Sequence, residues 1–195
     1  MSEISVILSI SLDGVIQAPG RPDEDTRGGF DRGGWAVPYN DEVMARRMGE
    51  GMASSGAMLF GRRTYEDFFG YWPRQTDNPF TPYLNQATKY VVSSTLSEPL
   101  PWQNSILLSG DPEVSVAELK IKPGPDLGIV GSGQLVRSLL AASLIDRLLL
   151  LIHPLVLGQG RRLFDEQGPG ADFELVESVT TSKGVIIAAY EPASR

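Results

Sequence analysis

The chain of 195 residues contains no cysteine, which excludes disulfide bonds, a cysteine nucleophile and a cysteine-based zinc site. It has one histidine, His153, which lies in the apolar run LLLLIHPLVLG directly before Pro154. A Ser-His-Asp triad would need this one residue, and a metal site built from several histidines is excluded. Its position favours a histidine within or at the end of a strand over a catalytic one. We expect no metal site.

Long apolar runs and basic runs are also missing. No stretch approaches the roughly 20 apolar residues of a membrane-spanning helix, and MSEISVILSISLDG lacks the features of a signal peptide. We therefore expect a cytoplasmic protein that does not act at a membrane. The formal net charge is −7 and no basic run exceeds two residues, so no nucleic-acid binding is expected. The pairs Arg62-Arg63 and Arg161-Arg162 are either solvated or part of a local pocket for an anionic ligand.

Apolar and periodic segments alternate along the chain, as in an α/β protein. Strands are predicted at residues 5–11, 57–60, 89–92, 106–108, 126–130, 147–156, 173–181 and 185–190. Helices are predicted at residues 40–54, with Asn40 as the cap, and at 64–69, 114–119 and 134–142, and loops at 17–39 and 70–82. We expect a single domain over residues 1–195. Its fold is a mixed, mostly parallel central sheet flanked by helices, with a C-terminal antiparallel hairpin.

In such sheets ligands bind beyond the carboxyl ends of the strands. Four predicted strand ends are polar or rich in glycine: SLDG (11–14), FGRRTYED (60–67), VSSTL (92–96) and VGSGQL (130–135). VGSGQL lacks the third glycine of a dinucleotide fingerprint and follows the fifth strand instead of the first. Gly131 and Gly133 still permit unusual φ angles and close approach of a ligand, and a helix N-terminus follows them. This segment is therefore either a phosphate cradle or a plain turn.

The segments FGRRTYED and VSSTL add to this pattern. Gly61 ends a predicted strand and Thr64 starts a predicted helix, so backbone amides and the Thr64 hydroxyl converge between them. Arg62 and Arg63 lie beside them as permanent cations. VSSTL offers the hydroxyls of Ser93 and Ser94 at a third strand end. An arginine near such a site suits the 2′-phosphate of NADP. Three strand ends that favour anions in one small domain indicate a cofactor pocket more strongly than any single one.

These segments resemble the dihydrofolate reductase fold family, and most closely its branch of riboflavin-pathway reductases, the RibD C-terminal domains. The resemblance covers nearly the whole chain and rests on SLDGVI, LFGRRTYE, VVSSTL, IVGSGQL and IDRLLLLIHPLVLGQGRRLF in this order. It implies NADPH as cofactor, with the adenine-side phosphates near residues 61–64 and 93–94 and the pyrophosphate near 131–135. The residues that it assigns to the cofactor are Ile16, Gly61, Arg62, Arg63, Thr64, Ser93, Ser94, Gly131, Ser132, Gly133, Gln134 and Leu135.

The substrate side follows the resemblance less closely. Dihydrofolate reductases have the motif W-x-x-P followed by an acidic residue in the first helix. Here Trp35 to Pro38 resemble this motif, but Asn40 occupies the position of the acidic residue. Asn40 is able to hydrogen-bond a ring but does not titrate. Asp41 either takes the catalytic role or is an acid in the first helical turn. Asp13 either forms a turn or, as the resemblance implies, orients the substrate, and Trp35 either shields the site from water or anchors the core.

The expected activity is that of an NADPH-dependent reductase acting on a C=N or C=O bond of a pterin- or pyrimidine-like small molecule. The nearest activities implied are reduction of 5-amino-6-(5-phosphoribosylamino)uracil and of dihydrofolate. The alternative is a non-catalytic NADP(H)- or pterin-binding protein of the same fold, which Asn40 favours. The apolar strand at 147–156 and the terminal hairpin would suit a homodimer. No role is assigned to Arg161 and Arg162, beyond a phosphate of the substrate as one option.

Overall fold

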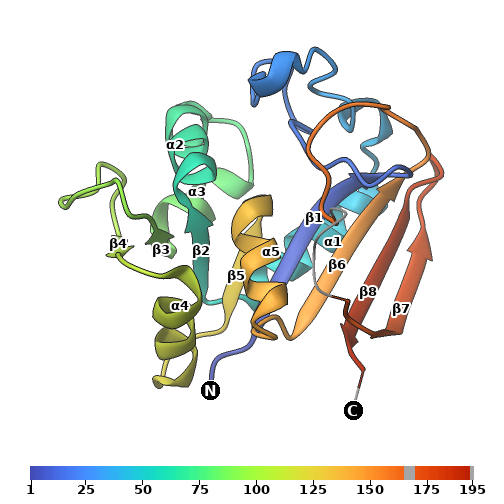
Figure 1. Cartoon of the computed structure of the whole chain (residues 1–195). Coiled ribbons are helices and arrows are strands. Elements are labelled where there is room, and N and C mark those ends of the chain that lie inside the picture. The colour runs from blue at the N-terminus through green and yellow to red at the C-terminus, as the bar shows by residue number, and fades with distance from the viewer. Residues whose placement is uncertain (165–169, 194–195) are drawn as a thin grey trace.

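A computed structural model of the chain describes residues 1–164 and 170–193. In these residues eight strands form one sheet with the order β4-β3-β2-β5-β1-β6-β8-β7 (Figure 1). The strands are β1 (Ile4–Ser11), β2 (Ala57–Gly61), β3 (Thr88–Val92), β4 (Ser105–Leu108), β5 (Leu127–Val130), β6 (Arg147–His153), β7 (Phe173–Thr180) and β8 (Ile186–Pro192).

The six strands from β4 to β6 are parallel, and β8 and β7 are added antiparallel at one end. This confirms the predicted mixed, mostly parallel sheet with a C-terminal antiparallel hairpin. Strand β2 follows β1 in the sequence, but in the sheet the two are separated by β5, which the chain forms later. The order of the strands therefore reverses around β2, β5 and β1, which is where open α/β sheets bind their ligands.

Helices cover both faces of the sheet. The α-helices are α1 (Glu42–Ser54), α2 (Arg62–Tyr71), α3 (Phe80–Gln86), α4 (Pro112–Ile121) and α5 (Gly133–Ala141), with short 3₁₀ turns η1 (Arg27–Gly29), η2 (Val37–Tyr39) and η3 (Trp72–Arg74). Helices α4 and α5 pack against one apolar cluster and α1, α2 and α3 against another. In Figure 1, α4 and α5 lie in front of the sheet and α1 lies behind it.

Strand β1 shows why the sheet lies at the centre of the fold. Its sequence ISVILSIS is rich in β-branched residues and has no turn former, and six of its eight residues are buried. Ile4, Val6, Leu8 and Ile10 enter the cluster beneath α4 and α5, whereas Ile7 enters the cluster beneath α1. Successive side chains of a strand point to opposite faces, so a nearly continuous apolar run supplies both clusters.

The structure corrects several predictions about the helices. Helix α1 begins at Glu42 and its N-cap is Asp41, whose carboxylate accepts the N–H of Met44, so Asn40 is not the cap. Helix α2 begins at Arg62, directly after β2, and not at Thr64. Helix α3 lies in and beyond the segment that was predicted as a loop up to residue 82.

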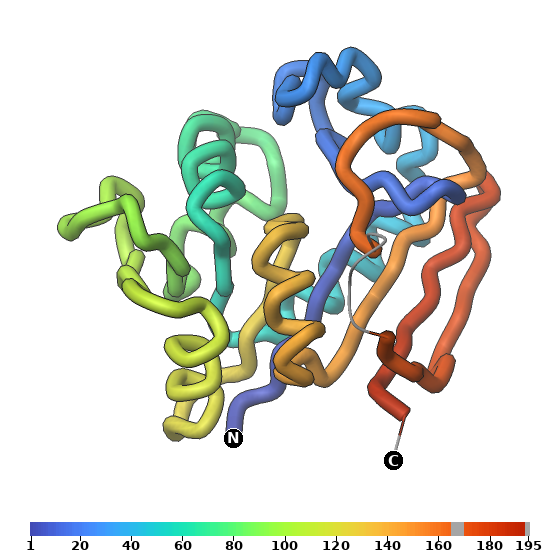
Figure 2. Tube along the Cα trace, viewed as in Figure 1, coloured from blue at the N-terminus to red at the C-terminus, as the bar shows by residue number. Residues whose placement is uncertain are grey.

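Residues 17–39 form the long loop that the sequence predicts, with η1 and η2 inside it. The loop lies over the carboxyl end of β1, beside the segment that follows β6 (Figures 1 and 2), and Gln17 of the loop accepts the N–H of Arg161 in that segment. None of the helices in the described part of the chain has the length and apolar character needed to cross a bilayer.

Candidate functional site

The predicted cofactor segments meet at one edge of the sheet. Strands β3, β2 and β5 are consecutive neighbours and parallel, so their carboxyl ends lie side by side. Ser93 follows β3, Gly61 ends β2 and Gly131 follows β5. The structure therefore brings together three of the segments that the sequence singles out.

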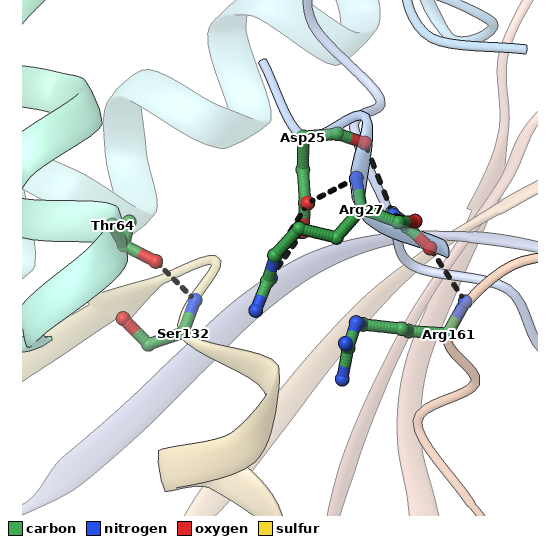
Figure 3. A network of polar contacts seen from close by, with 6 residues as sticks. Asp25, Arg27, Thr64, Ser132 and Arg161 are labelled. Carbon is green, nitrogen blue, oxygen red and sulfur yellow. Dashed lines mark hydrogen bonds and ion pairs between the residues drawn. The ribbon is translucent and has the colours of Figure 1, made fainter. Parts of the chain in front are cut away.

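The β2–α2 and β5–α5 turns are joined by two reciprocal hydrogen bonds. The N–H of Gly61 donates to Oγ of Ser132 over 3.0 Å. The N–H of Ser132 donates to Oγ1 of Thr64 over 3.0 Å, and Figure 3 shows this second bond. Both hydroxyl oxygens act as acceptors here, and neither O–H has an acceptor among the described residues. Each hydroxyl therefore keeps a hydrogen for a ligand.

The backbone of the glycine turn is unusual. Gly131 has φ +72°, and Ser132 has φ 55° and ψ 39°, a left-handed conformation that residues other than glycine rarely adopt. The two hydrogen bonds to Ser132 hold this conformation in place. Backbone strain of this kind persists where the surroundings fix it, and it concentrates at functional sites.

Gly133 leaves the space that the side chain of Ile16 occupies. A Cβ atom at this position would collide with the side chain of Ile16, which the sequence assigns to the cofactor site. A Cβ atom at Gly131 would lie 3.2 Å from Cγ2 of Thr64, so this glycine also permits a close approach within the protein. The glycines thus serve the turn itself and bring Ile16 beside the start of α5.

The start of α5 fits an anionic group such as a cofactor phosphate. Ser132 is the N-cap but makes no side-chain bond to the helix, because its hydroxyl is used by Gly61. The first turn of α2 also has no side-chain cap, since its N-cap is Gly61. Two helix N-termini therefore present N–H groups without a protein cap at neighbouring places, and each carries partial positive charge.

The other predicted cofactor residues occupy different environments. Arg62 forms a surface ion pair with Glu66 at 3.0 Å, and Arg63 is exposed. Ser93 is buried, and its hydroxyl oxygen accepts the N–H groups of Thr95 and Leu96 at 3.1 and 3.0 Å, so it shapes the turn. Ser94 is exposed. The side chain of Leu135 is in the core beneath α5, so only its backbone is able to meet a ligand, and Gln134 is exposed.

On the substrate side, Trp35 is buried and its indole N–H donates to the backbone oxygen of Gln17 over 2.7 Å. Its ring packs with Val15, Phe30 and Leu157, so Trp35 anchors the long loop to the sheet. Asn40 is exposed at the end of η2. Its role as a substrate ligand remains a prediction.

Both oxygens of the Asp41 carboxylate have protein partners. Oδ1 accepts the N–H of Met44 at 2.9 Å, and Oδ2 accepts the N–H and the hydroxyl of Ser182 at 2.8 and 2.7 Å. The Met44 amide, followed by the Ser182 hydroxyl, lowers the pKa of Asp41. Asp41 therefore joins α1 to the β7–β8 turn, and its catalytic role remains a prediction.

Asp13 connects the end of β1 to the segment after β6. Its carboxylate accepts the N–H groups of Leu157 and Gly158 at 3.0 and 2.8 Å and the hydroxyl of Ser11 at 2.7 Å. Arg162 adds an ion pair at 3.4 Å. Burial opposes ionisation of Asp13, but the Ser11 hydroxyl and the two amides outweigh it and lower the pKa to about 2. Asp13 is thus an anion at neutral pH. It also lies in the predicted turn, where the N–H of Gly14 donates to the backbone oxygen of Ser11.

The single histidine of the chain also lies at this edge. His153 ends β6, is fully buried and lies edge-on to Trp35 and Tyr39, with ring centroids 5.1 and 5.5 Å away. Neither ring nitrogen has a hydrogen-bond partner among the described residues, and burial lowers its pKa to about 4. The strand-end prediction for His153 is confirmed. In the sequence, the position of His153 within an apolar run already indicated a strand, whereas no pattern singled out Gln17 or Arg27 as residues of this edge.

Among residues 1–164 and 170–193, no three acidic or histidine side chains lie together in a way that would hold a metal ion. The chain matches the family model of the RibD C-terminal domain over residues 3–187. It belongs to the RibD C-terminal domain family. This membership confirms the resemblance that the strand-end segments indicate.

Similar proteins agree with this assignment. The uncharacterized protein YyaP of Bacillus subtilis is 28% identical over 137 residues, which cover 68% of this chain and 72% of YyaP. A protein assigned to riboflavin biosynthesis in Shewanella sp. PV-4 shares the fold with a TM-score of 0.72 and 23% identity, and each chain is covered completely. The dihydrofolate reductase of Enterococcus faecalis, solved with NADP(H), superposes with a TM-score of 0.60 and 16% identity over 98% of this chain and 97% of its own. The RibD C-terminal domain of this chain therefore has the dihydrofolate reductase-like fold.

Proposed function

We propose that the protein is an NADPH-dependent reductase that transfers a hydride to a C=N or C=O carbon of a pterin- or pyrimidine-like substrate. The observation that carries the proposal is the pair of joined turns at Gly61–Thr64 and Gly131–Gly133, which present two uncapped helix N-termini at one edge. Membership of a reductase family supports the type of reaction. The fold shared with an NADP(H)-bound dihydrofolate reductase supports the cofactor.

In this proposal the chain binds and orients, and bound NADPH supplies the hydride. The N–H groups at the start of α5 and α2 hold phosphate oxygens, assisted by the hydroxyls of Ser132 and Thr64. Ile16, packed against Gly133, forms an apolar wall next to these phosphates. Arg63 and Ser94, both exposed beside the turns, are the groups available for the 2′-phosphate.

The long loop of residues 17–39 covers the substrate side. Trp35 fixes the loop over β6, and a closed loop excludes water from a reactive hydride. Asp13, with a pKa of about 2, does not donate a proton at neutral pH. Its role in the proposed reaction is to hold the end of β1 against the segment after β6 on the substrate side, because each of its carboxylate oxygens already accepts two hydrogen bonds from the protein.

A second candidate function is a non-catalytic NADP(H)- or pterin-binding protein of the same fold. The observation in its favour is that no carboxylic acid at the predicted positions is ready to protonate a substrate. Asn40 does not titrate, the Asp41 oxygens are bonded to Met44 and Ser182, and Asp13 is ionised. A substrate protonated by water would reconcile this arrangement with turnover.

Turnover separates the two candidates. NADPH is incubated with the protein and either dihydrofolate or 5-amino-6-(5-phosphoribosylamino)uracil, and the loss of reduced nicotinamide is followed by absorbance. We expect oxidation that depends on one of the substrates. The variant Asp13→Asn is expected to lower kcat/KM by about a hundredfold, because it releases the segment after β6. The control Asp111→Asn changes a cap at α4 and is expected to keep full activity. Binding of NADPH without oxidation would favour the second candidate.

A further inference from the structure

Gln17 joins two loop segments that carry arginines, at the same edge as the glycine turn. Its side chain is buried, and its amide nitrogen donates to the backbone oxygens of Asp25 and Arg27 at 3.0 and 2.9 Å. Its amide oxygen accepts the N–H of Arg161 at 2.9 Å, although the two residues are 144 positions apart in the chain. Gln17 thus fixes the backbones of Arg27 and Arg161 beside each other (Figure 3).

Arg27 has one guanidinium nitrogen left over. Nε donates to the carboxylate of Asp25 over 2.6 Å and Nη2 forms an ion pair with the same carboxylate. Nη1 is buried and has no hydrogen-bond partner within the described residues. An unpaired buried donor on a permanent cation is costly, and an acceptor bound there would remove the cost.

Arg161 contributes a second guanidinium that the fold does not use. Its backbone is held at both sides, by Gln17 and by the N–H of Ile16, which donates to the Arg161 oxygen. Its side chain is exposed and makes no hydrogen bond or ion pair with any described residue. Burial raises the pKa of Asp25, but the bonds and charge of Arg27 and the charge of Arg161 together lower it. Within the described residues the Asp25 carboxylate is bonded to Arg27 alone, and the three side chains together carry one net positive charge.

The pair borders the proposed cofactor site. Arg161 is hydrogen-bonded to Ile16, and the Ile16 side chain lies against Gly133. In Figure 3 the side chains of Arg27 and Arg161 both extend toward the side on which Thr64 and Ser132 lie. A chain with a formal net charge of −7 thus carries a local cationic pair beside a turn that favours anions.

We propose that Arg27 and Arg161 form a binding site for a phosphate group. Two guanidiniums from separate segments offer several N–H donors, and an acceptor with three or more oxygens is able to meet both at once. The phosphate belongs either to the cofactor or to a second ligand. The site itself does not require turnover, and only the choice between these two sources rests on the proposed function.

The first test uses inorganic phosphate, titrated into the protein and followed by calorimetry. Arg161→Gln is the main variant, because its side chain has no other bond to lose. We expect it to weaken phosphate binding about tenfold or more, since it removes charge-assisted hydrogen bonds. Arg27→Lys, which keeps the charge but loses the fork, is expected to weaken binding as well. The control Arg46→Gln, an exposed arginine of α1, is expected to bind as the wild type does. Equal affinity in all four proteins would overturn the proposal.

The second test identifies the source of the phosphate by titrating NADPH into the wild type and Arg161→Gln. A parallel loss of NADPH affinity would assign the site to the cofactor. Unchanged NADPH affinity, with phosphate still bound by the wild type in the presence of NADPH, would assign it to a second, phosphorylated ligand. A wild type that binds phosphate through Arg161 but does not bind NADPH would overturn the proposed function and leave this site standing.

Discussion

His153 is an imidazole enclosed by aromatic rings, without a polar partner in the described part of the chain, at the end of the strand beside β1. Burial lowers its pKa from 6.5 to about 4, so the folded protein keeps it neutral at physiological pH. The unfolded chain takes up a proton below pH 6.5. Stability is therefore lost as the pH falls from about 6.5 toward 4, by about 3 kcal/mol for this one group.

This loss of stability at low pH gives a prediction for the variant His153→Phe. The variant keeps an aromatic ring between Trp35 and Tyr39 but has no group to protonate. We expect the wild type to lose about 3 kcal/mol more than the variant between pH 7 and pH 4, measured by urea unfolding at both values. Asp13 and the other carboxyl groups titrate in both proteins and cancel in the comparison. An equal loss in the two proteins would show that His153 is not buried as described.

At the scale of elements, strand β7 is the most exposed part of the sheet. It pairs only with β8 in the described residues, and its Leu175 and Val176 are 55% and 46% exposed. An open strand edge with apolar side chains favours pairing with another chain, and identical subunits most often pair about a two-fold axis. The expected homodimer would therefore use β7.

Light scattering over a range of protein concentrations tests this prediction. We expect a dimer for the wild type and a monomer for Val176→Lys, because a charge at a strand edge opposes pairing. The melting temperature of the monomeric fold should change little, since Val176 is on the surface. A wild type that stays monomeric at high concentration would contradict the role of β7.

The elements also show where sequence patterns suffice. All eight strands lie within or close to the predicted segments, because β-branched apolar runs between turn residues identify buried strands well. Helix α3 was missed because Pro79 and Pro82 indicate a loop. In the structure Pro79 is the N-cap and Pro82 is in the first turn, where a missing N–H costs no helical hydrogen bond. Asn40 and Asp41 are both residue types that cap helices well, so the sequence alone does not decide which of the two is the N-cap of α1.

For the whole molecule, the location of the site was predictable and its internal bonding was not. Parallel strands place their carboxyl ends at one edge, so Gly61, Ser93 and Gly131 were expected together. The bonds from Gln17 to Arg27 and Arg161 depend on two loops meeting across the fold. The same holds for the contact of Ile16 with Gly133, because a single sequence carries no signal for such distant pairs.

The central claim is that the joined glycine turns hold NADPH, and the most direct measurement is a titration of NADPH followed by its fluorescence. We expect saturable binding by the wild type at micromolar concentration. Gly133→Ala should weaken it by about tenfold or more, because the added methyl group displaces Ile16 from the wall of the site. Gly70→Ala is the control, since its new methyl group meets no atom. Absence of binding by the wild type at tens of micromolar NADPH, or equal binding by wild type and Gly133→Ala, would contradict the account.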